Sequence, residues 1–573
     1  MRWEKTVDQW FAVEQDGELV GLFEPSRRWH QEGQWVNEAI YHIADTPSLF
    51  AQADTALYQV LMLFNKMRLD PSHPPACYQE AEQWMQAKGL DDPELQNLED
   101  MPFVTIDNPD SRDLDQALYL QRLSNGTRVV YALADAAYYI RPGSALFTEA
   151  LSRGVTYYAP SFAAPMLPPA LSEGLISLNP DVLRRALVFD ISLDNNGDTC
   201  SAAVYQARIR SRAKLSYQGV QAWLDQKAAG KKHEWDGLDY CDSLALMPVI
   251  GELRMDLARE RNVVEHNRRE AQMRIDADNP QEFTLHMRDR NDVERYNEQI
   301  SLLCNMVGAQ MLLRQEKLSE ELQAVFRVHL PPIEERVETL KQSLHNICDM
   351  RQLPDLWRWD GEQPLADYLD GLPTDQPRLR QAIERQIMLI NHASEFSSEP
   401  GPHHALGVDG YARFSSPMRE IAGIFTHKEL LEVQGKLDPQ PIEADVKLRE
   451  QVIDAANAAK KTQRKLEKSF QLHIVEQFLR SDLSLEKADR PVREATVMGM
   501  RGTRIYLAVD GLALDLKIYA SDLEQRWNCK YTVSDTQALP DDKSAPSLRI
   551  GDIARLQTDR WDESRSRFVL HLV

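Results

Sequence analysis

The stretch FVTIDNPDSRDLDQAL, residues 103–118, runs from an apolar segment into a turn that holds four aspartates. Residues 103–106 have the apolar and β-branched character of a strand, and Asn108-Pro109 begins a turn. Carboxylates this close repel one another, and they stay ionised together only where cations lie between them. The stretch therefore predicts the rim of a sheet that carries either a divalent-metal site or a solvated acidic turn.

The loop positions narrow the type of metal. An EF-hand for calcium has an oxygen ligand at loop position 3, glycine at position 6 and glutamate at position 12. Here those positions hold Pro109, Arg112 and Leu118. Calcium by that route is excluded, and all-oxygen ligation at the end of a strand favours Mg²⁺ or Mn²⁺.

Strands and helices follow one another outward from this stretch. Residues 116–120 and 129–133 have strand character on either side of Asn125-Gly126, a strong hairpin signal. Helical spacing dominates from about residue 201 to residue 482, and the long candidates are residues 241–262, 293–318, 378–394 and 445–480. Five short alternating segments after residue 490 suit a small barrel of the OB type.

The first 95 residues differ from the central strands, because residues 37–69 and 76–90 carry apolar residues at helical spacing. We therefore expect an α+β, multidomain protein. Its predicted parts are a mainly helical N-terminal domain over 1–95, a mixed sheet-and-helix domain over 96–485 and an OB-fold β-barrel over 490–573.

Composition excludes several classes of protein. No apolar stretch follows the N-terminus, and residues 154–172 are charge-free but contain four prolines, so neither a signal peptide nor a membrane span is expected. The six cysteines form no CxxC pair, which argues against a zinc site and fits a cytoplasmic location. A net charge of -22 requires any nucleic-acid path to be local.

Further segments resemble the ribonuclease II and ribonuclease R family in the same order along the chain. Residues 103–118 resemble its aspartate signature, and the similarity continues through residues 131–144, 156–178 with Arg184, 213–224 and 399–419. The last of these, which includes Ser415-Ser-Pro-Met-Arg419, is similar to the family's T-S-P-I-R segment. The resemblance covers the chain from about residue 100 to the C-terminus.

What the resemblance implies is a metal-dependent, processive 3′-to-5′ exoribonuclease that degrades single-stranded RNA to nucleoside 5′-monophosphates. The middle domain would be an RNB-type catalytic domain and the C-terminal barrel an S1-like domain. Mg²⁺ or Mn²⁺ would be the cofactor, and single-stranded RNA the partner.

Residue roles follow from the same resemblance. Asp107, Asp113 and Asp115 match the first three metal-site aspartates, and Gln116 stands at the fourth ligand position. Catalysis would rest on Asp115, Arg419 and Glu467. The expected RNA-binding residues are Tyr158, which matches the tyrosine at the terminal nucleotide, Arg184, and the barrel residues Tyr506, Lys517 and Tyr519.

Structural alternatives remain open for several of these residues. Arg419 could be a surface arginine at a helix start, and Glu467 could form an ion pair with Arg464. Tyr158 could be a core aromatic, and its neighbour Tyr157 leaves the register open.

Departures from the family pattern define a second hypothesis. Gln116 removes one negative charge from the site, and Glu420-Ile-Ala-Gly423 replaces a segment that begins with a basic residue in the family. Two cold-shock barrels do not fit into the N-terminal region, where a winged-helix-like module is possible instead. The alternative is a catalytically weak or inactive relative that acts as an RNA-binding or protein-interaction module. The retained aspartates with Arg419 and Glu467 favour the enzyme.

Overall fold

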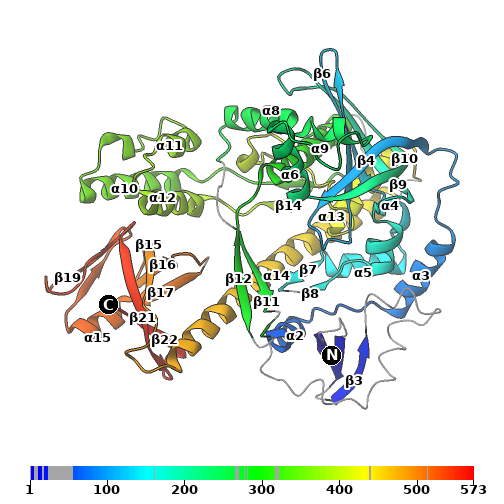
Figure 1. Cartoon of the computed structure of the whole chain (residues 1–573). Helices are drawn as coiled ribbons and strands as arrows, with labels where there is room; N and C mark the ends of the chain where they lie inside the picture. The colour runs from blue at the N-terminus through cyan, green and yellow to red at the C-terminus, as the bar shows by residue number, and fades with distance from the viewer. Residues whose placement is uncertain are drawn as a thin grey trace. The chain divides into compact units, whose positions relative to one another are not determined.

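The computed structural model describes most of the chain in two compact units. The described residues are 2–5, 11–15, 18–23, 56–160, 162–264, 270–276, 278–279, 282–316, 322–437, 441–512 and 514–573. The first unit comprises Met1–Arg261, Arg290–His329 and Ser394–Leu466, and the second comprises Asn262–Asp289, Leu330–Ala393 and Glu467–Val573. Figure 1 gives the labels of the elements.

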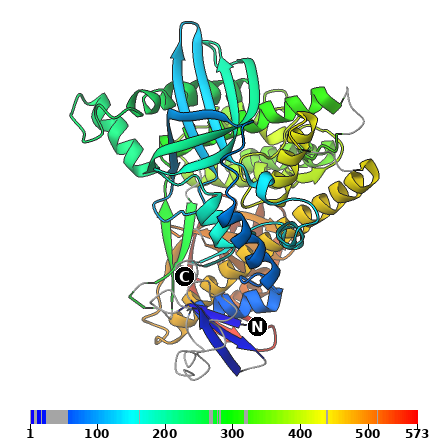
Figure 2. The same cartoon turned by 90° about the vertical axis from the view of Figure 1, so that its right-hand side faces the viewer.

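A closed five-stranded barrel forms the centre of the first unit (Figures 1 and 2). Its strand order is β10-β4-β5-β6-β9, and β4 pairs in parallel with β10, which closes the ring. The strands are β4 (Gln96–Asp107), β5 (Gln116–Leu123), β6 (Gly126–Ala134), β9 (Leu183–Leu193) and β10 (Thr199–Ser216). Because the barrel has no free edge, its strand ends form the rim on which the aspartate turn lies.

The predicted hairpin joins β5 to β6, and Leu123 pairs with Gly126. Glycine is required there, because a Cβ at Gly126 would lie 1.9 Å from the carbonyl oxygen of Leu193. The prediction from Asn125-Gly126 is therefore confirmed by a turn that packs directly against β9.

Helices pack around this barrel and share one apolar core with it. The long helices predicted over 293–318, 378–394 and 445–480 are present with small shifts at their ends, whereas the one predicted over 241–262 is divided into α7 (Cys241–Leu244) and a second helix that begins at Met247. The helices that enclose the barrel are α6 (Tyr217–Ala228), α8 (Met247–Glu260), α9 (Asp292–Glu316), α13 (Ile421–Val433) and the first part of α14 (Ile442–Leu483). The first unit also contains two short strand pairs, β13 (Phe326–Val328) with β14 (Glu395–Ser397) and β7 (Tyr157–Ala159) with β8 (Phe162–Ala164).

The N-terminal region contains more strand than its helical spacing predicts. β1 (Arg2–Lys5), β2 (Phe11–Gln15) and β3 (Glu18–Phe23) form an antiparallel sheet ahead of α2 (Ala56–Met67) and α3 (Pro75–Gln86). Helix thus covers only part of the region expected to be mainly helical, and residues 37–55 of the first predicted helix lie outside the described residues. The Asp16-Gly17 dipeptide between β2 and β3 is a hairpin signal that the helical interpretation missed.

The C-terminal sheet of the second unit has the strand order β17-β16-β15-β21-β22, the Greek-key order of an OB-fold. Its strands are β15 (Arg493–Arg501), β16 (Arg504–Val509), β17 (Asp515–Tyr519), β21 (Ile553–Asp562) and β22 (Arg567–Leu572). The predicted α+β, multidomain class with a C-terminal OB-type fold is confirmed.

Three helices of the second unit share a core with this sheet. They are α10 (Glu334–Arg351), α11 (Leu365–Gly371) and α12 (Pro377–Ile390). Met498 of β15 and Ile550, in the turn that precedes β21, are buried among the helical apolar residues. Gln386 of α12 donates to the Met498 carbonyl at 2.6 Å, and a Cβ at Gly499 would lie 2.6 Å from its amide nitrogen. The division at residue 490 stays a prediction, because residues 330–393 group with the sheet that follows it.

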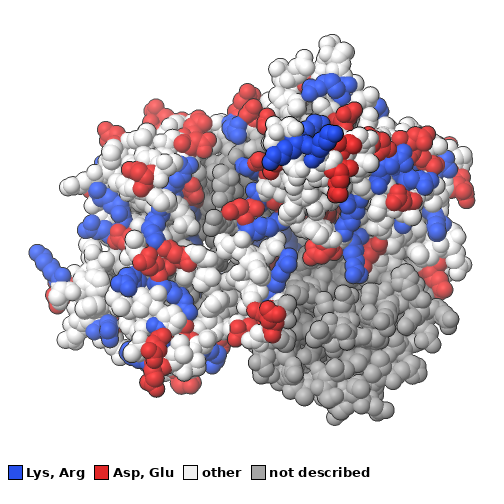
Figure 3. All heavy atoms as spheres, viewed as in Figure 1, with Lys and Arg blue, Asp and Glu red and all other residues white. Residues whose placement is uncertain are grey.

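The described surface carries both signs of charge. On the face shown in Figure 3, Lys and Arg are interspersed with Asp and Glu. Among the described helices, none is long and apolar enough to cross a membrane.

Candidate nuclease site

A pocket of 270 Å³ lies at the rim of the barrel, where β4 ends and β5 begins. It is lined by polar side chains from the barrel, from α9 and from the segment that precedes α13. Those that bear on its chemistry are Asp107, Asp115, Gln116, Glu294, Glu298 and Arg419.

Asp115 is the buried carboxylate of this pocket, with 2% of its surface exposed. Arg419 Nε donates to Asp115 Oδ2 at 2.6 Å, and the backbone N–H of Met418 donates to Oδ1 at 3.0 Å. The pKa of Asp115 is raised to about 6, because burial and nearby Asp113 raise it by more than Arg419 lowers it. Asp115 is thus a carboxylate whose charge the protein alone compensates only in part.

Asp113 lies between Arg419 and the exposed aromatic ring of Tyr158. Its Oδ2 lies 3.9 Å from Arg419 Nε and accepts a hydrogen bond from Tyr158 Oη at 3.4 Å. Burial raises the pKa of Asp113, and Arg419 counteracts the rise.

The structure distinguishes the two neighbouring tyrosines of β7. Tyr157 is buried and donates to the Arg153 carbonyl, whereas Tyr158 is 45% exposed. Gln463 of α14 holds the Tyr158 backbone at both its N–H and its carbonyl, each at 3.1 Å. The ring beside Asp113 is therefore that of Tyr158, on a fixed backbone.

Gln116 lines the pocket, but the protein binds both ends of its amide. Its Nε2 donates to the carbonyl of Ser415, and its Oε1 accepts from the hydroxyl of Tyr131. The role of Gln116 as a metal ligand stays a prediction. Its contacts favour a second role, in which the amide ties β5 to the segment that carries Arg419.

The donor chemistry of the pocket fits a divalent cation. Asp107 ends β4 opposite Ser216 and supplies a third carboxylate. Hard cations such as Mg²⁺ take oxygen ligands, and a cation would stabilise the ionised forms of Asp113 and Asp115, whose pKa values burial raises. The three aspartates would hold the cation.

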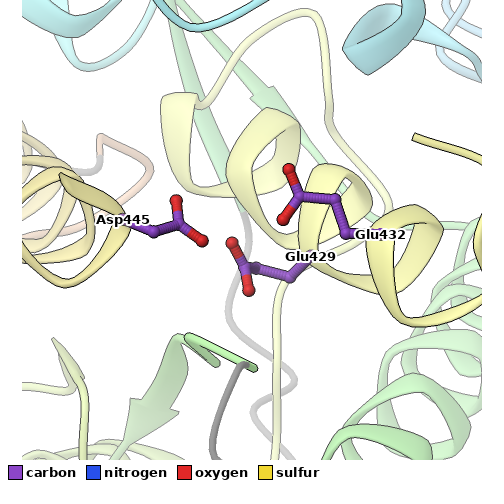
Figure 4. Close-up of side chains that lie close together, drawn as sticks. All are labelled: Glu429, Glu432 and Asp445. Atoms are coloured by element: carbon purple, nitrogen blue, oxygen red, sulfur yellow. The ribbon is translucent and has the colours of Figure 1, made fainter. Parts of the chain in front are cut away.

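A different acidic group lies between α13 and α14, and an ammonium group already occupies it. The carboxylates of Glu429, Glu432 and Asp445 point toward one another (Figure 4), with one oxygen of each within 4.8 Å of the others. Lys428 Nζ lies 2.7, 2.9 and 2.7 Å from these three carboxylates in turn. This buried cluster is an internal ion-pair network, distinct from the pocket.

Two predicted site residues are absent from the lining of the pocket. The guanidinium of Arg184 donates to the carbonyls of Ser177, Leu183 and Gly174. Those contacts favour a structural role for Arg184. Glu467 is exposed on α14, falls in the second unit and is absent from the lining of the pocket.

The barrel residues expected to bind RNA share one face of the C-terminal sheet. Tyr506 pairs with Lys517 across β16 and β17, and Arg504 pairs with Tyr519. These positions alternate with the buried ones along both strands, so their side chains lie on the outer face. Arg567 lies over the ring of Tyr519, 3.9 Å from its centroid.

Sequence reasoning missed most of the pocket wall formed by α9. Glu294, Asn297, Glu298 and Ser301 all line the pocket and recur at helical spacing. A polar stripe on a helix whose other residues are mostly buried was the signal that could have found them.

Comparison with known protein families identifies the class of protein to which this chain belongs. The model of the RNB domain matches residues 95–435, which span the barrel, α9 and α13. These features define an RNB-domain protein.

The matching relatives narrow this class further. The chain is 30% identical to ribonuclease R of Vibrio parahaemolyticus over 345 residues, which cover 58% of this chain and 38% of the relative. It is 28% identical to ribonuclease R of Escherichia coli over 495 residues, or 83% of this chain and 57% of the relative. The chain therefore belongs to the ribonuclease II and ribonuclease R family of exoribonucleases, although it covers less than two thirds of either relative.

Solved structures show the same fold. Mycoplasma genitalium RNase R, in complex with ribose methylated single-stranded RNA, covers the whole of this chain, with 89% of its own length matched, a TM-score of 0.78 and 18% identity. Yeast Ssd1, described as a pseudonuclease, matches 76% of this chain and 51% of its own length, with a TM-score of 0.55 and 16% identity.

Proposed function

We propose that the chain is a divalent-metal-dependent 3′-to-5′ exoribonuclease that hydrolyses single-stranded RNA to nucleoside 5′-monophosphates. The observation that carries this proposal is the pairing of buried Asp115 with Arg419, next to Asp113 and beside exposed Tyr158. This arrangement supplies groups for a cation, a phosphate and a terminal nucleotide within one region.

Hydrolysis of a phosphodiester needs an activated water and compensation of the charge that builds on the phosphate. Mg²⁺ or Mn²⁺ at Asp107, Asp113 and Asp115 would supply both kinds of chemistry. Arg419 is oriented by its Nε bond to Asp115, and its planar fork of further N–H groups would contact phosphate oxygens.

Tyr158 would position the end of the RNA strand. Its exposed ring offers a stacking surface for a base, which suits a site that accepts any sequence. The hydroxyl of Tyr158, which donates to Asp113 Oδ2, would contact a ribose. Since the 2′-hydroxyl distinguishes RNA from DNA, we propose that RNA is the substrate.

The test is degradation of a 5′-labelled single-stranded RNA with Mg²⁺ or Mn²⁺, beside a DNA of the same sequence. We expect progressive shortening from the 3′ end, release of nucleoside 5′-monophosphates and no shortening with EDTA. Equal cleavage of the DNA would refute the role of the ribose.

One observation favours the second candidate, a binding protein with weak or no catalysis. The neutral amide of Gln116 is held by Ser415 and Tyr131 at a position where the resemblance expects an aspartate. In the same assay, RNA that is retained but not shortened with either metal supports the binding protein.

A further inference from the structure

Basic side chains gather around Glu420, the residue that follows Arg419, at a place that the proposed mechanism does not use. Arg413 Nη2 lies 3.2 Å from Glu420 Oε1. Burial by itself would raise the pKa of Glu420, but Arg413, Arg327 and Arg419 outweigh it, so the pKa lies below its ordinary value. Glu420 is therefore an ionised carboxylate inside a cationic environment.

Two of the surrounding cations rely on a neutral acceptor. Lys460 Nζ donates to the carbonyl and the hydroxyl oxygen of Ser394 at 2.7 and 2.8 Å. Arg327 Nε donates to the same hydroxyl oxygen at 3.3 Å. The pKa of Lys460 is lowered to about 7, first by burial and then by Arg327 and Arg464. Ser394 thus accepts hydrogen bonds from both Lys460 and Arg327, two basic side chains that repel each other.

We call Arg327, Arg413, Glu420, Lys460 and Arg464 the Glu420 cluster. It contains four basic groups and one carboxylate, all within the first unit. Among the described residues, neither Arg413 Nε nor Glu420 Oε2 has a hydrogen-bond partner, although both atoms are buried. Hydrogen bonding inside the cluster is therefore incomplete on both sides, and the basic groups outnumber the single carboxylate.

The cluster adjoins the pocket and is open to solvent in part. Arg413 itself lines the pocket, and its Nη2 also donates to the hydroxyl of Ser416, another lining residue, at 3.3 Å. The side chains of Arg413 and Glu420 are 26% and 21% exposed. A group that enters from the pocket can therefore reach Arg413 without a change in the backbone.

We propose that the Glu420 cluster is a phosphate subsite of the bound RNA strand, in which Glu420 is an internal anion that competes with a strand phosphate for Arg413. This proposal rests on the proposed function, because it places a second RNA phosphate beside the one at Arg419. A phosphate has more acceptor oxygens than the carboxylate and suits the planar fork of an arginine. In this arrangement, Glu420 lowers the affinity of the protein for the RNA strand.

The test measures binding of single-stranded RNA to the full chain in EDTA, where no turnover interferes. We expect Glu420→Gln to bind the RNA on the order of 10-fold more tightly, since one like charge is removed at contact distance. The plot of log affinity against log salt should steepen by about 0.7, the increment for one added phosphate contact on a single strand. Lys460→Met should change both quantities in the opposite direction.

Glu395→Gln is the matched control, because Glu395 is exposed on β14 next to Ser394 and the substitution removes the same charge. Equal tightening in both variants would show a general charge effect and overturn the proposal. Unchanged RNA affinity and salt slope in Glu420→Gln would overturn it as well. A melting curve of each variant verifies that it is folded.

A nucleoside 5′-monophosphate is the second probe. If Glu420→Gln tightens the binding of the mononucleotide but not of the RNA, the assignment to a strand phosphate is refuted. Tighter binding of RNA without any degradation in Mg²⁺ or Mn²⁺ supports the subsite while it refutes the nuclease, so the two proposals fail separately.

Discussion

At the scale of single residues, Asp115 is the most buried carboxylate of the pocket, and its ion pair with Arg419 measures 2.6 Å. We expect Asp115→Asn to lower the rate of RNA degradation by about 10²–10³-fold or more, the cost of losing one charge-stabilising group. Affinity for RNA in EDTA should change little. Single-turnover rates with Mg²⁺ and Mn²⁺ measure the first effect.

The control for this prediction is Asp110→Asn, because Asp110 lies in the same turn but is exposed and outside the lining of the pocket. It should keep nearly full activity. Full activity in Asp115→Asn would place the metal site elsewhere.

The contacts of Gln116 in the structure alter the expected effect of the substitution Gln116→Asp. The sequence alone predicts that Gln116→Asp adds a metal ligand and lowers the demand for metal. In the structure the shorter aspartate would lose the bond to the Ser415 carbonyl, and it has no N–H group to replace it. We expect Gln116→Asp to lower the free energy of unfolding by about 1–3 kcal/mol in EDTA.

Urea denaturation measures that loss, and Gln116→Glu, which keeps the length of the side chain but also has no N–H group for the Ser415 carbonyl, should be destabilised as well. A lower requirement for Mg²⁺ in Gln116→Asp, with unchanged stability, would instead support the role of a fourth ligand.

The residues of the site differ in how far the sequence could predict them. The aspartate turn and Arg419 lie in local motifs, and the structure brings them to one pocket. The partners of Gln116 could not be predicted, because Ser415 lies 299 positions away and is joined to it only by folding. Glu467 has the spacing of the family motif, but local spacing does not fix the position of an exposed side chain in space.

At the scale of elements, the network around Lys428 links α13 to the first turn of α14. Burial raises the pKa of Glu429 to about 7, Asp445 raises it too, and Lys428 opposes them. The folded chain thus keeps a proton that the unfolded chain releases near the ordinary value. The stability gained from it is complete below that value and is lost as the pH rises through about 7.

We therefore expect Glu429→Gln to gain stability relative to the unchanged protein between pH 5 and pH 8, by up to about 3 kcal/mol. The groups that face Glu429 are Lys428 and Glu432 of α13, Asp445 of α14 and the backbone N–H of Gln323. Melting temperatures across this pH range measure the difference. Glu443→Gln, at an exposed position of α14, should show no such trend, and a flat difference for Glu429→Gln would contradict the prediction.

Elements were predictable where one pattern dominated. The 25 residues of α9 and the 42 of α14 repeat helical spacing over many turns, so their prediction needed no tertiary information. The strands β1 to β3 are only 4, 5 and 6 residues long, and such short segments give a weak periodic signal. The closure of the barrel by β4 and β10 is a pairing across more than a hundred residues, which no local pattern encodes.

At the scale of the whole molecule, the outer face of β16 and β17 is the best candidate for additional RNA contacts. Replacing both Arg504 and Lys517 with alanine should weaken RNA binding and reduce its salt slope by about 1.4, or 0.7 for each lost phosphate contact. The control is Arg555→Ala with Lys543→Ala, which removes the same charge from other parts of the C-terminal region. If the unchanged protein, the Arg504 and Lys517 double variant and the control all show the same salt slope of RNA binding, the sheet does not contact RNA phosphates.

Deletion of residues 490–573 is a less specific experiment, because Met498 and Ile550 belong to a core shared with α10 and α12. Their removal should expose Trp357 and neighbouring apolar residues. We expect the truncated chain to bind a hydrophobic dye and to melt at a lower temperature. Unchanged dye binding would show that the three helices hold their core alone.

The bond between Asp115 and Arg419 joins residues 304 positions apart. During synthesis, the aspartate turn leaves the ribosome long before the arginine has been made. A growing chain therefore has no assembled pocket until most of its length is present and folded. On the proposed function, an enzyme that destroys RNA is translated from an RNA template, and this order of assembly keeps the new chain from cutting the template until Arg419 has been made and has folded against Asp115.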